Sequence, residues 1–116
     1  MKEESAIKQD KGIPQTINIP LAHAQMYGIN EAIYLGMLGI ISGYKMDDFT
    51  HLNYPLLLEA LNLNYTEQAR LVKGLEFRGI IETKTVRENS KNKKVFRINY
   101  RKLEEDADMH LEYRRK

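Results

Sequence analysis

The side chains that could do chemistry gather between residues 64 and 102, and most of them are cations. This stretch carries eleven Lys and Arg against four Asp and Glu, a local net charge of +7. The first 63 residues carry −3 and the last 14 carry −2, which gives the whole chain its +2. Because a local basic surface attracts polyanions whatever the rest of the chain carries, this segregation favours a polyanionic partner.

The first part of the basic stretch is predicted to be a helix from about residue 65 to residue 78. Asn64 and Glu67 have the spacing of a capping box, and Gly79 suits the position after the last helical residue. An apolar stripe at helical spacing is expected to face inward: Ala69, Val72 and Leu75, supported by Leu71. Five polar side chains would then lie on the outer face: Tyr65, Thr66, Gln68, Arg70 and Lys73.

These residue types can read the edges of base pairs. A Gln can pair bidentately with adenine, an Arg can do so with guanine, and a Thr can contact a thymine methyl group. Lys73 is better suited to a phosphate. The alternative is that these side chains form an ordinary solvated helix face.

Two alternating segments follow, over residues 80–87 and 95–100, and predict a β-hairpin. Phe96, Ile98 and Tyr100 would share one face, and residues 88–93 would form a tip without an apolar side chain. Such a basic hairpin can bind phosphates through counterion release, although Lys residues also protect exposed strand edges from pairing. The candidate phosphate-binding residues are Lys84, Arg87, Lys91, Asn92, Lys93, Lys94 and Arg97.

The first half of the chain is expected to supply the core. Residues 1–14 are polar and aperiodic and predict a flexible tail, 15–19 alternate like a short strand, and 21–27 could form one or two helical turns. With Asn30 as its cap, a helix over 31–41 would be apolar almost all round. It would therefore be buried in the core or against a second subunit. Gly36 and Gly39 would let another element approach it closely.

Two further helices are predicted. Residues 43–53 are expected to form a loop, and Pro55 suits the first turn of a short helix over 56–61. That helix would add Leu56, Leu57, Leu58 and Leu61 to the core before a turn at 62–64. After residue 102, apolar residues recur every fourth position and predict a helix: Leu103, Ala107 and Leu111.

Residues 63–70 (LNYTEQAR) and 75–82 (LEFRGIIE) resemble the second half of a winged helix-turn-helix domain. That family commonly ends its recognition helix in Leu-Glu-x-Lys/Arg-Gly-Leu/Ile-Ile. Residues 27–35 (YGINEAIYL) resemble the first-helix entry of such domains in replication and mobile-element proteins of low-GC Gram-positive bacteria. Two residues depart from the family pattern: Gln68 stands where many members have a buried Val or Ile, and Gly74 interrupts the recognition helix.

The resemblance implies an α+β fold with a three-helix core, an antiparallel wing of two to three strands and a C-terminal helical extension. The domain would cover residues 15–102, and the extension residues 103–116. Its implied function is sequence-specific binding of double-stranded DNA at a promoter or a replication or transfer origin of a plasmid, phage or other mobile element. We expect a homodimer, because a single small module buries too little surface for tight selective binding. Two alternatives stay open: an accessory protein of a transfer or replication origin that uses mainly the wing, with the machinery proteins as further partners, or a protein–protein adaptor.

Other function classes find little support. The chain has no cysteine, which excludes disulfides and thiolate zinc sites and favours an intracellular protein. His23, His51 and His110 are scattered, and neither a nucleophile elbow nor a Gly-rich phosphate loop is present. We therefore expect no enzyme, metal or cofactor. The apolar run over 32–41 is too short to cross a bilayer and the N-terminus lacks a signal-peptide core, so we expect a soluble cytoplasmic protein.

Overall fold

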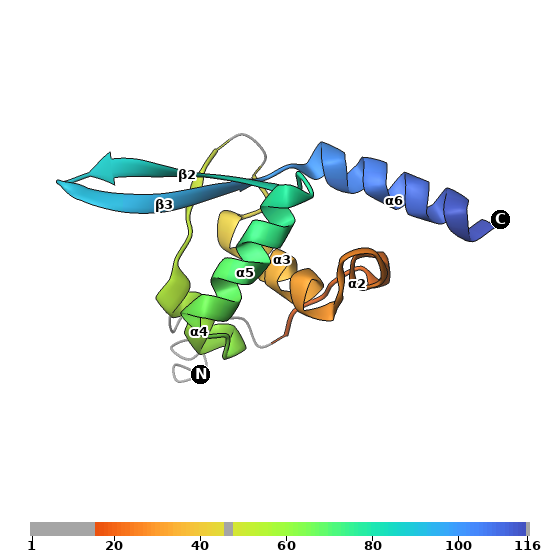
Figure 1. The fold of residues 1–116 in the computed structure, drawn as a ribbon, viewed down its shortest axis with the longest axis horizontal. Helices are drawn as coiled ribbons and strands as arrows, with labels where there is room; N and C mark the ends of the chain where they lie inside the picture. Colours follow the sequence, from red (N-terminus) through yellow and green to blue (C-terminus); the bar gives the residue numbers. More distant parts are fainter. Residues whose placement is uncertain (1–15, 46–47, 116) are drawn as a thin grey trace, which may run out of the picture.

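The chain folds as an α+β protein in which helices cover one side of a small antiparallel sheet (Figure 1). The computed structural model describes residues 16–45 and 48–115, so the predicted tail over 1–14 lies outside the described residues. Within these ranges there are five helices and three strands. In chain order they are α2 (Leu21–Tyr27), α3 (Ile29–Ser42), β1 (Thr50–His51), α4 (Tyr54–Leu61), α5 (Tyr65–Phe77), β2 (Ile81–Glu88), β3 (Lys91–Ile98) and α6 (Tyr100–Arg115).

The hairpin of β2 and β3 is longer than predicted and projects away from the helices (Figure 1). Its register runs from Ile81 opposite Ile98 to Glu88 opposite Lys91. The predicted six-residue tip is wrong, because the turn contains only Asn89 and Ser90. Both have positive φ, 52° and 64°, as a tight two-residue hairpin turn requires.

The third strand, β1, falls inside the predicted loop over 43–53, so that part of the prediction is wrong. It pairs antiparallel with β3, Thr50 opposite Phe96 and His51 opposite Val95, and gives the sheet the order β1–β3–β2. A strand of two residues is too short to leave an alternating pattern in the sequence.

Helix α5 begins and ends as its sequence predicts. The Asn64 side chain accepts a hydrogen bond from the Glu67 backbone N–H at 2.8 Å, and the Glu67 carboxylate accepts one from the Asn64 N–H at 3.2 Å. This confirms the capping box. At the other end Gly79 has φ 78°, the left-handed conformation that ends many helices.

The predicted inward face of α5 is partly wrong. Gln68 is fully buried instead of lying on the outer face, and Ala69 is exposed instead of facing inward. The residues that face inward are Gln68, Leu71, Val72 and Leu75. They recur at regular helical spacing, and the first of them is polar.

The buried Gln68 amide is fully engaged in hydrogen bonds. Its Oε1 accepts from the Tyr34 hydroxyl of α3 at 3.0 Å. Its Nε2 donates to the carbonyl oxygens of Tyr54, at the start of α4, and Leu63, in the turn before α5, at 3.1 and 3.0 Å. A buried polar group costs little when its partners satisfy it, so this residue can join three segments inside the core.

Helix α3 lies at the centre of the core, with Ala32, Tyr34, Leu35, Met37 and Leu38 buried. The core interpretation of this helix is therefore confirmed. Its predicted start is wrong, since the helix begins at Ile29. Its N-cap is Gly28, at φ 108°, and not Asn30.

Gly36 of α3 allows the chain before α2 to pack closely. A Cβ at this position would lie 2.6 Å from Cγ2 of Ile19, so only glycine leaves room for that side chain. The described part of the predicted strand, residues 16–19, has no regular secondary structure and pairs with none of the described strands. The close approach predicted for Gly36 is confirmed, and the prediction of a strand before α2 is wrong.

Of the remaining three helices, α2 spans the predicted residues 21–27, and α4 and α6 form with shifted ends. In α4, Pro55 lies in the first turn as predicted; Leu57 is fully buried, but Leu58 is 38% exposed and does not join the core. Helix α6 begins at Tyr100, three residues before the predicted extension, and its far end extends beyond α2 (Figure 1). None of the described helices combines the length and apolarity needed to cross a membrane.

We expect Gln68→Leu to lower the free energy of unfolding by about 3 kcal/mol, because it removes three hydrogen bonds at once, one from the buried Tyr34 hydroxyl and two to part-buried carbonyls. Tyr34→Phe removes only one of these bonds and should cost about 1–2 kcal/mol. Urea unfolding of both variants measures the difference. A loss below about 0.5 kcal/mol for Gln68→Leu would contradict the network.

Candidate nucleic-acid interface

The outer face of α5 carries most of the side chains predicted for it. Thr66, Arg70 and Lys73 are exposed along one side of the helix. Tyr65 is 53% exposed, and its ring centroid lies 5.9 Å from that of Tyr54. Gln68 is removed from this set, because its burial in the core puts its amide out of reach of any base.

Sequence reasoning missed Phe77, in the last turn of α5. Its side chain is 94% exposed, although an apolar residue at the end of an amphipathic helix would be expected to pack inward. The sequence indicates this placement only through spacing. Phe77 lies four residues after Lys73 and seven after Arg70, so it lies on the same side of the helix as these two residues.

The hairpin has two faces of different character. Residues of one face pack against the helices near the base of the hairpin, and Thr83 on this face donates a hydrogen bond to Glu76 of α5. Because side chains alternate between the two faces of a strand, Thr85 and Arg87 of β2 lie on the same inner face, as do Asn92 and Lys94 of β3. Neither strand places an acidic residue on the inner face.

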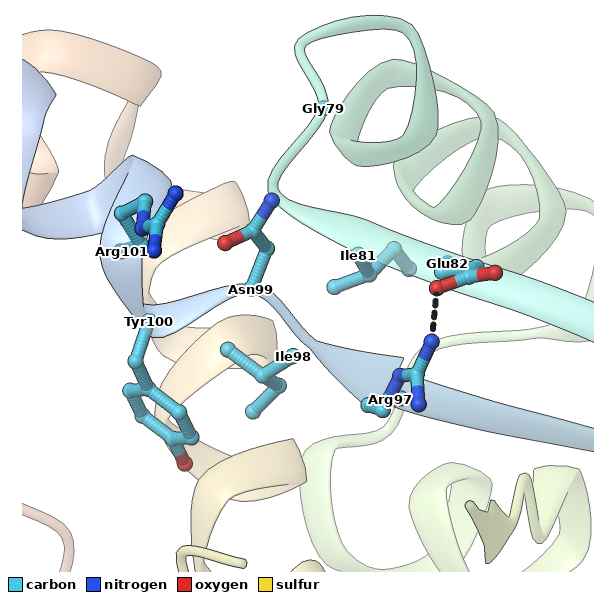
Figure 2. Close-up of a pocket in the computed structure, with 8 residues that line it drawn as sticks. All are labelled: Gly79, Ile81, Glu82, Arg97, Ile98, Asn99, Tyr100 and Arg101. Carbon is cyan, nitrogen blue, oxygen red and sulfur yellow. Dashed lines mark hydrogen bonds and ion pairs between the residues drawn. The ribbon is translucent and has the colours of Figure 1, made fainter. Parts of the chain in front are cut away.

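The outer face of the hairpin carries charges of both signs, with the acidic residues on β2. Lys93 pairs with Glu88 and Arg97 pairs with Glu82, each at 2.7 Å; Figure 2 shows the second pair. The Lys93 hydrogen bond holds the pKa of the Glu88 carboxyl below its usual range.

The Phe49 ring covers part of this outer face. The Lys84 ammonium lies 4.2 Å from the ring centroid and the Arg97 guanidinium 4.4 Å, both within cation–π range. Of the seven residues predicted to bind phosphates on the hairpin, three therefore already contact other residues of the chain: Lys84, Lys93 and Arg97.

The other predicted cations are differently placed. Arg87, Lys91 and Lys94 of the hairpin, and Arg70 and Lys73 of α5, make no ion pair with another residue that the structure describes. A hollow separates the end of the hairpin from the start of α4, with Lys91, Asn92 and Lys94 on one side and Pro55 on the other. The predicted cations that are without an ion pair or a cation–π contact among the described residues therefore lie on α5, at the hairpin tip and on the inner face of the hairpin.

A second hollow lies where the hairpin meets α6 (Figure 2). Three of its polar side chains are engaged within the fold: Arg97 pairs with Glu82, and the Asn99 side chain accepts a hydrogen bond from the Lys102 backbone N–H at 3.1 Å. This bond satisfies a backbone donor in the first turn of α6. In the described ranges, no three His, Asp or Glu residues gather where they could hold a metal ion.

A cluster of four polar and aromatic residues connects α6 to the end of α5. Asp106 accepts hydrogen bonds from the Tyr27 hydroxyl and from the Lys102 ammonium, both at 2.8 Å. The Arg78 guanidinium, directly after α5, lies 5.4 Å from the centroid of the Tyr27 ring. The placement of α6 is thereby coupled to the end of the helix that carries the candidate interface.

Contacts within this cluster shift three pKa values, and the hydrogen bond to Asp106 raises that of Lys102. Partial burial raises the pKa of the Asp106 carboxyl, but the hydrogen bonds from Lys102 and Tyr27, with the charges of Lys102 and Arg78, outweigh burial and hold it below its usual 3.8. Burial, with the hydrogen bond to this carboxylate, raises the pKa of Tyr27.

Comparison of the chain with models of protein families, with curated proteins and with solved structures gave no match in any of the three.

We expect Gly74→Ala to raise the free energy of unfolding by about 1 kcal/mol, because Gly74 lies within α5 and an added Cβ would meet open space. Gly36→Ala is the matched control and should lower it, since its Cβ would collide with Ile19. Urea unfolding of both variants checks the pair; a loss of stability in Gly74→Ala would show that this glycine is needed where it stands.

We expect Asp106→Asn to be less stable than the parent at pH 7, and the gap to close as the pH falls below 3.8. A carboxyl whose pKa is lowered by folding stabilises the fold above its unfolded pKa and loses that contribution as the pH falls through its folded pKa. Urea unfolding over a pH series measures the gap, and a gap that stays constant with pH would contradict this assignment.

Proposed function

We propose that this protein is a winged helix-turn-helix protein that binds double-stranded DNA with sequence preference. In this proposal α3, α4 and α5 are the three-helix core, α5 is the recognition helix, and the β2–β3 hairpin is the wing. The element order α3, β1, α4, α5, β2, β3 and the sheet order β1–β3–β2 support it. The tight turn between α4 and α5, with Asn62 in the left-handed conformation at φ 58°, supports the helix-turn-helix assignment.

The observation that carries the proposal is the position of the cations without an ion pair among the described residues. Arg70 and Lys73 lie on the outer face of α5, and Arg87 and Lys94 lie on the face of the hairpin that α5 contacts. Lys91 adds a charge at the tip. A helix inserted in the major groove and a hairpin beside it would bring these charges to the phosphates of one duplex.

Each part has its own task in this proposal. Thr66 and Arg70 are suited to base edges, while Lys73 and the hairpin cations neutralise phosphates without reading sequence. If Lys73 and the three hairpin cations Arg87, Lys91 and Lys94 each meet a phosphate, log K should fall with log salt at a slope of about −3.6 per bound copy.

We further propose that the protein acts as a homodimer, because a single small module buries too little surface for tight selective binding. The last turns of α6 offer a surface for a second copy, with Met109 70% and Tyr113 78% exposed. Binding would occur at a promoter or a replication or transfer origin of a mobile element, the setting that the family resemblance implies.

The test is fluorescence anisotropy with DNA flanking the gene and with scrambled DNA, over about 50 to 300 mM salt, the range in which phosphate contacts weaken most visibly. We expect a preference of about a hundredfold or more, together with a steep salt slope. Absence of binding at the lowest salt would overturn the proposal.

We expect Lys94→Ala to weaken binding to every duplex and to lower the magnitude of the salt slope by about 1, because Lys94 lies on the inner face of the hairpin. Lys93→Ala is the matched control. It removes the same charge from the next residue of the same strand, but on the outer face, where Lys93 already pairs with Glu88. We expect its affinity to stay within about twofold of the parent, as for an exposed ion pair of little net worth. Equal losses for the two variants would show that the face assignment is wrong.

A further inference from the structure

Phe77 is the most exposed large apolar side chain in the part of the chain that the structure describes, at 94%. It therefore adds almost nothing to the core, and a polar residue would serve the fold equally well. Single exposed apolar residues are common on protein surfaces. The position of this one sets it apart from Leu21 and Ile29, which are exposed on or next to α2.

Phe77 lies in the cationic stripe on the outer face of α5. Lys73 is one turn before it and Arg70 two turns before it, and both are exposed. The buried residues Leu71 and Leu75 are on the opposite side of the helix. A polyanion bound along the whole of this face would meet the Phe77 ring beside Lys73.

The neighbouring Arg78 does not cover this ring. Its guanidinium lies over Tyr27, 5.4 Å from that ring centroid, and so takes part in the contact with α6. Phe77 makes no ring contact with another aromatic residue in the described ranges. The ring is thus free to contact a ligand that approaches α5 from outside.

We propose that Phe77 contacts a thymine methyl group in the major groove and contributes to sequence preference there. This inference rests on the proposed function, with α5 as the recognition helix. The other groups that base pairs present in the major groove are hydrogen-bond donors and acceptors, which a phenyl ring cannot satisfy. The thymine methyl is the apolar group that it can cover, so Phe77 selects thymine over cytosine at its position, while Arg70 and Lys73 hold the phosphates and polar edges around it.

The test is a double-mutant cycle between protein and DNA. The full-length chain first selects a duplex from a random library. Its affinity is then measured with thymine and with deoxyuridine at each position in turn, which removes only the methyl group. We expect Phe77→Ala to bind the selected duplex about tenfold more weakly than the parent, the loss typical of one base contact. Deoxyuridine at one position should weaken the parent by a similar factor and leave the Phe77→Ala variant unchanged.

Two controls separate contact from stability. Leu21→Ala removes another largely exposed apolar side chain, 71% exposed on α2, and should bind both duplexes as the parent does. The urea midpoint of Phe77→Ala should match that of the parent, because the ring is outside the core.

The outcomes distinguish this inference from the function on which it rests. If the chain selects no duplex, the proposed function fails, and the role of Phe77 fails with it. If the chain selects a duplex and Lys94→Ala weakens binding, but Phe77→Ala binds like the parent, only the role of Phe77 is overturned. An equal loss from deoxyuridine in the parent and in Phe77→Ala would also overturn it.

Discussion

The buried amide of Gln68 determines how the rest of the structure is arranged. Three hydrogen bonds join it to Tyr34 of α3, to the first residue of α4 and to the turn before α5. A buried amide has few orientations that satisfy its donors and its acceptor together, so this set of bonds fixes the rotation of α5 about its own axis. A rotation that released the amide would leave several polar groups unpaired in the core, each at a cost of about 1–3 kcal/mol. Because α5 is held in this rotation, Arg70 and Lys73 face away from the core.

The two faces of the hairpin also differ in charge. On its outer face, Glu82 and Glu88 pair with Arg97 and Lys93, so this side has a mixed charge. On its inner face, cations and short polar residues follow the apolar residues of the base without an acidic neighbour. A local basic surface can therefore form on a chain whose net charge is only +2. The Tyr27–Asp106 hydrogen bond, with Arg78 over the Tyr27 ring, then ties α6 to the end of α5, so a second copy bound through α6 would hold two such surfaces at a defined spacing.

The sequence predicted the features that depend on local chemistry. The Asn64–Glu67 capping box, the glycine after α5, the central apolar helix and the antiparallel hairpin all follow from neighbouring residues, and the structure confirms them. Features that depend on tertiary contacts were missed. Gln68 was expected on the outer face because a polar residue there looks solvated, and only the Tyr34 hydroxyl and two carbonyls from other segments explain its burial. Likewise, β1 exists because β3 offers it a partner, and the charges of Lys93 and Arg97 are neutralised by cross-strand contacts that composition does not reveal.

In the proposed function, DNA binds across the outer face of α5 and the inner face of the hairpin. The most direct measurement is the change in backbone amide chemical shifts when the ¹⁵N-labelled protein is titrated with a duplex. We predict the largest changes over residues 65–78 and 85–94, with small changes in the first three turns of α6. Changes confined to α6 and α2, with α5 and the hairpin unaffected by a duplex that binds, would contradict this account.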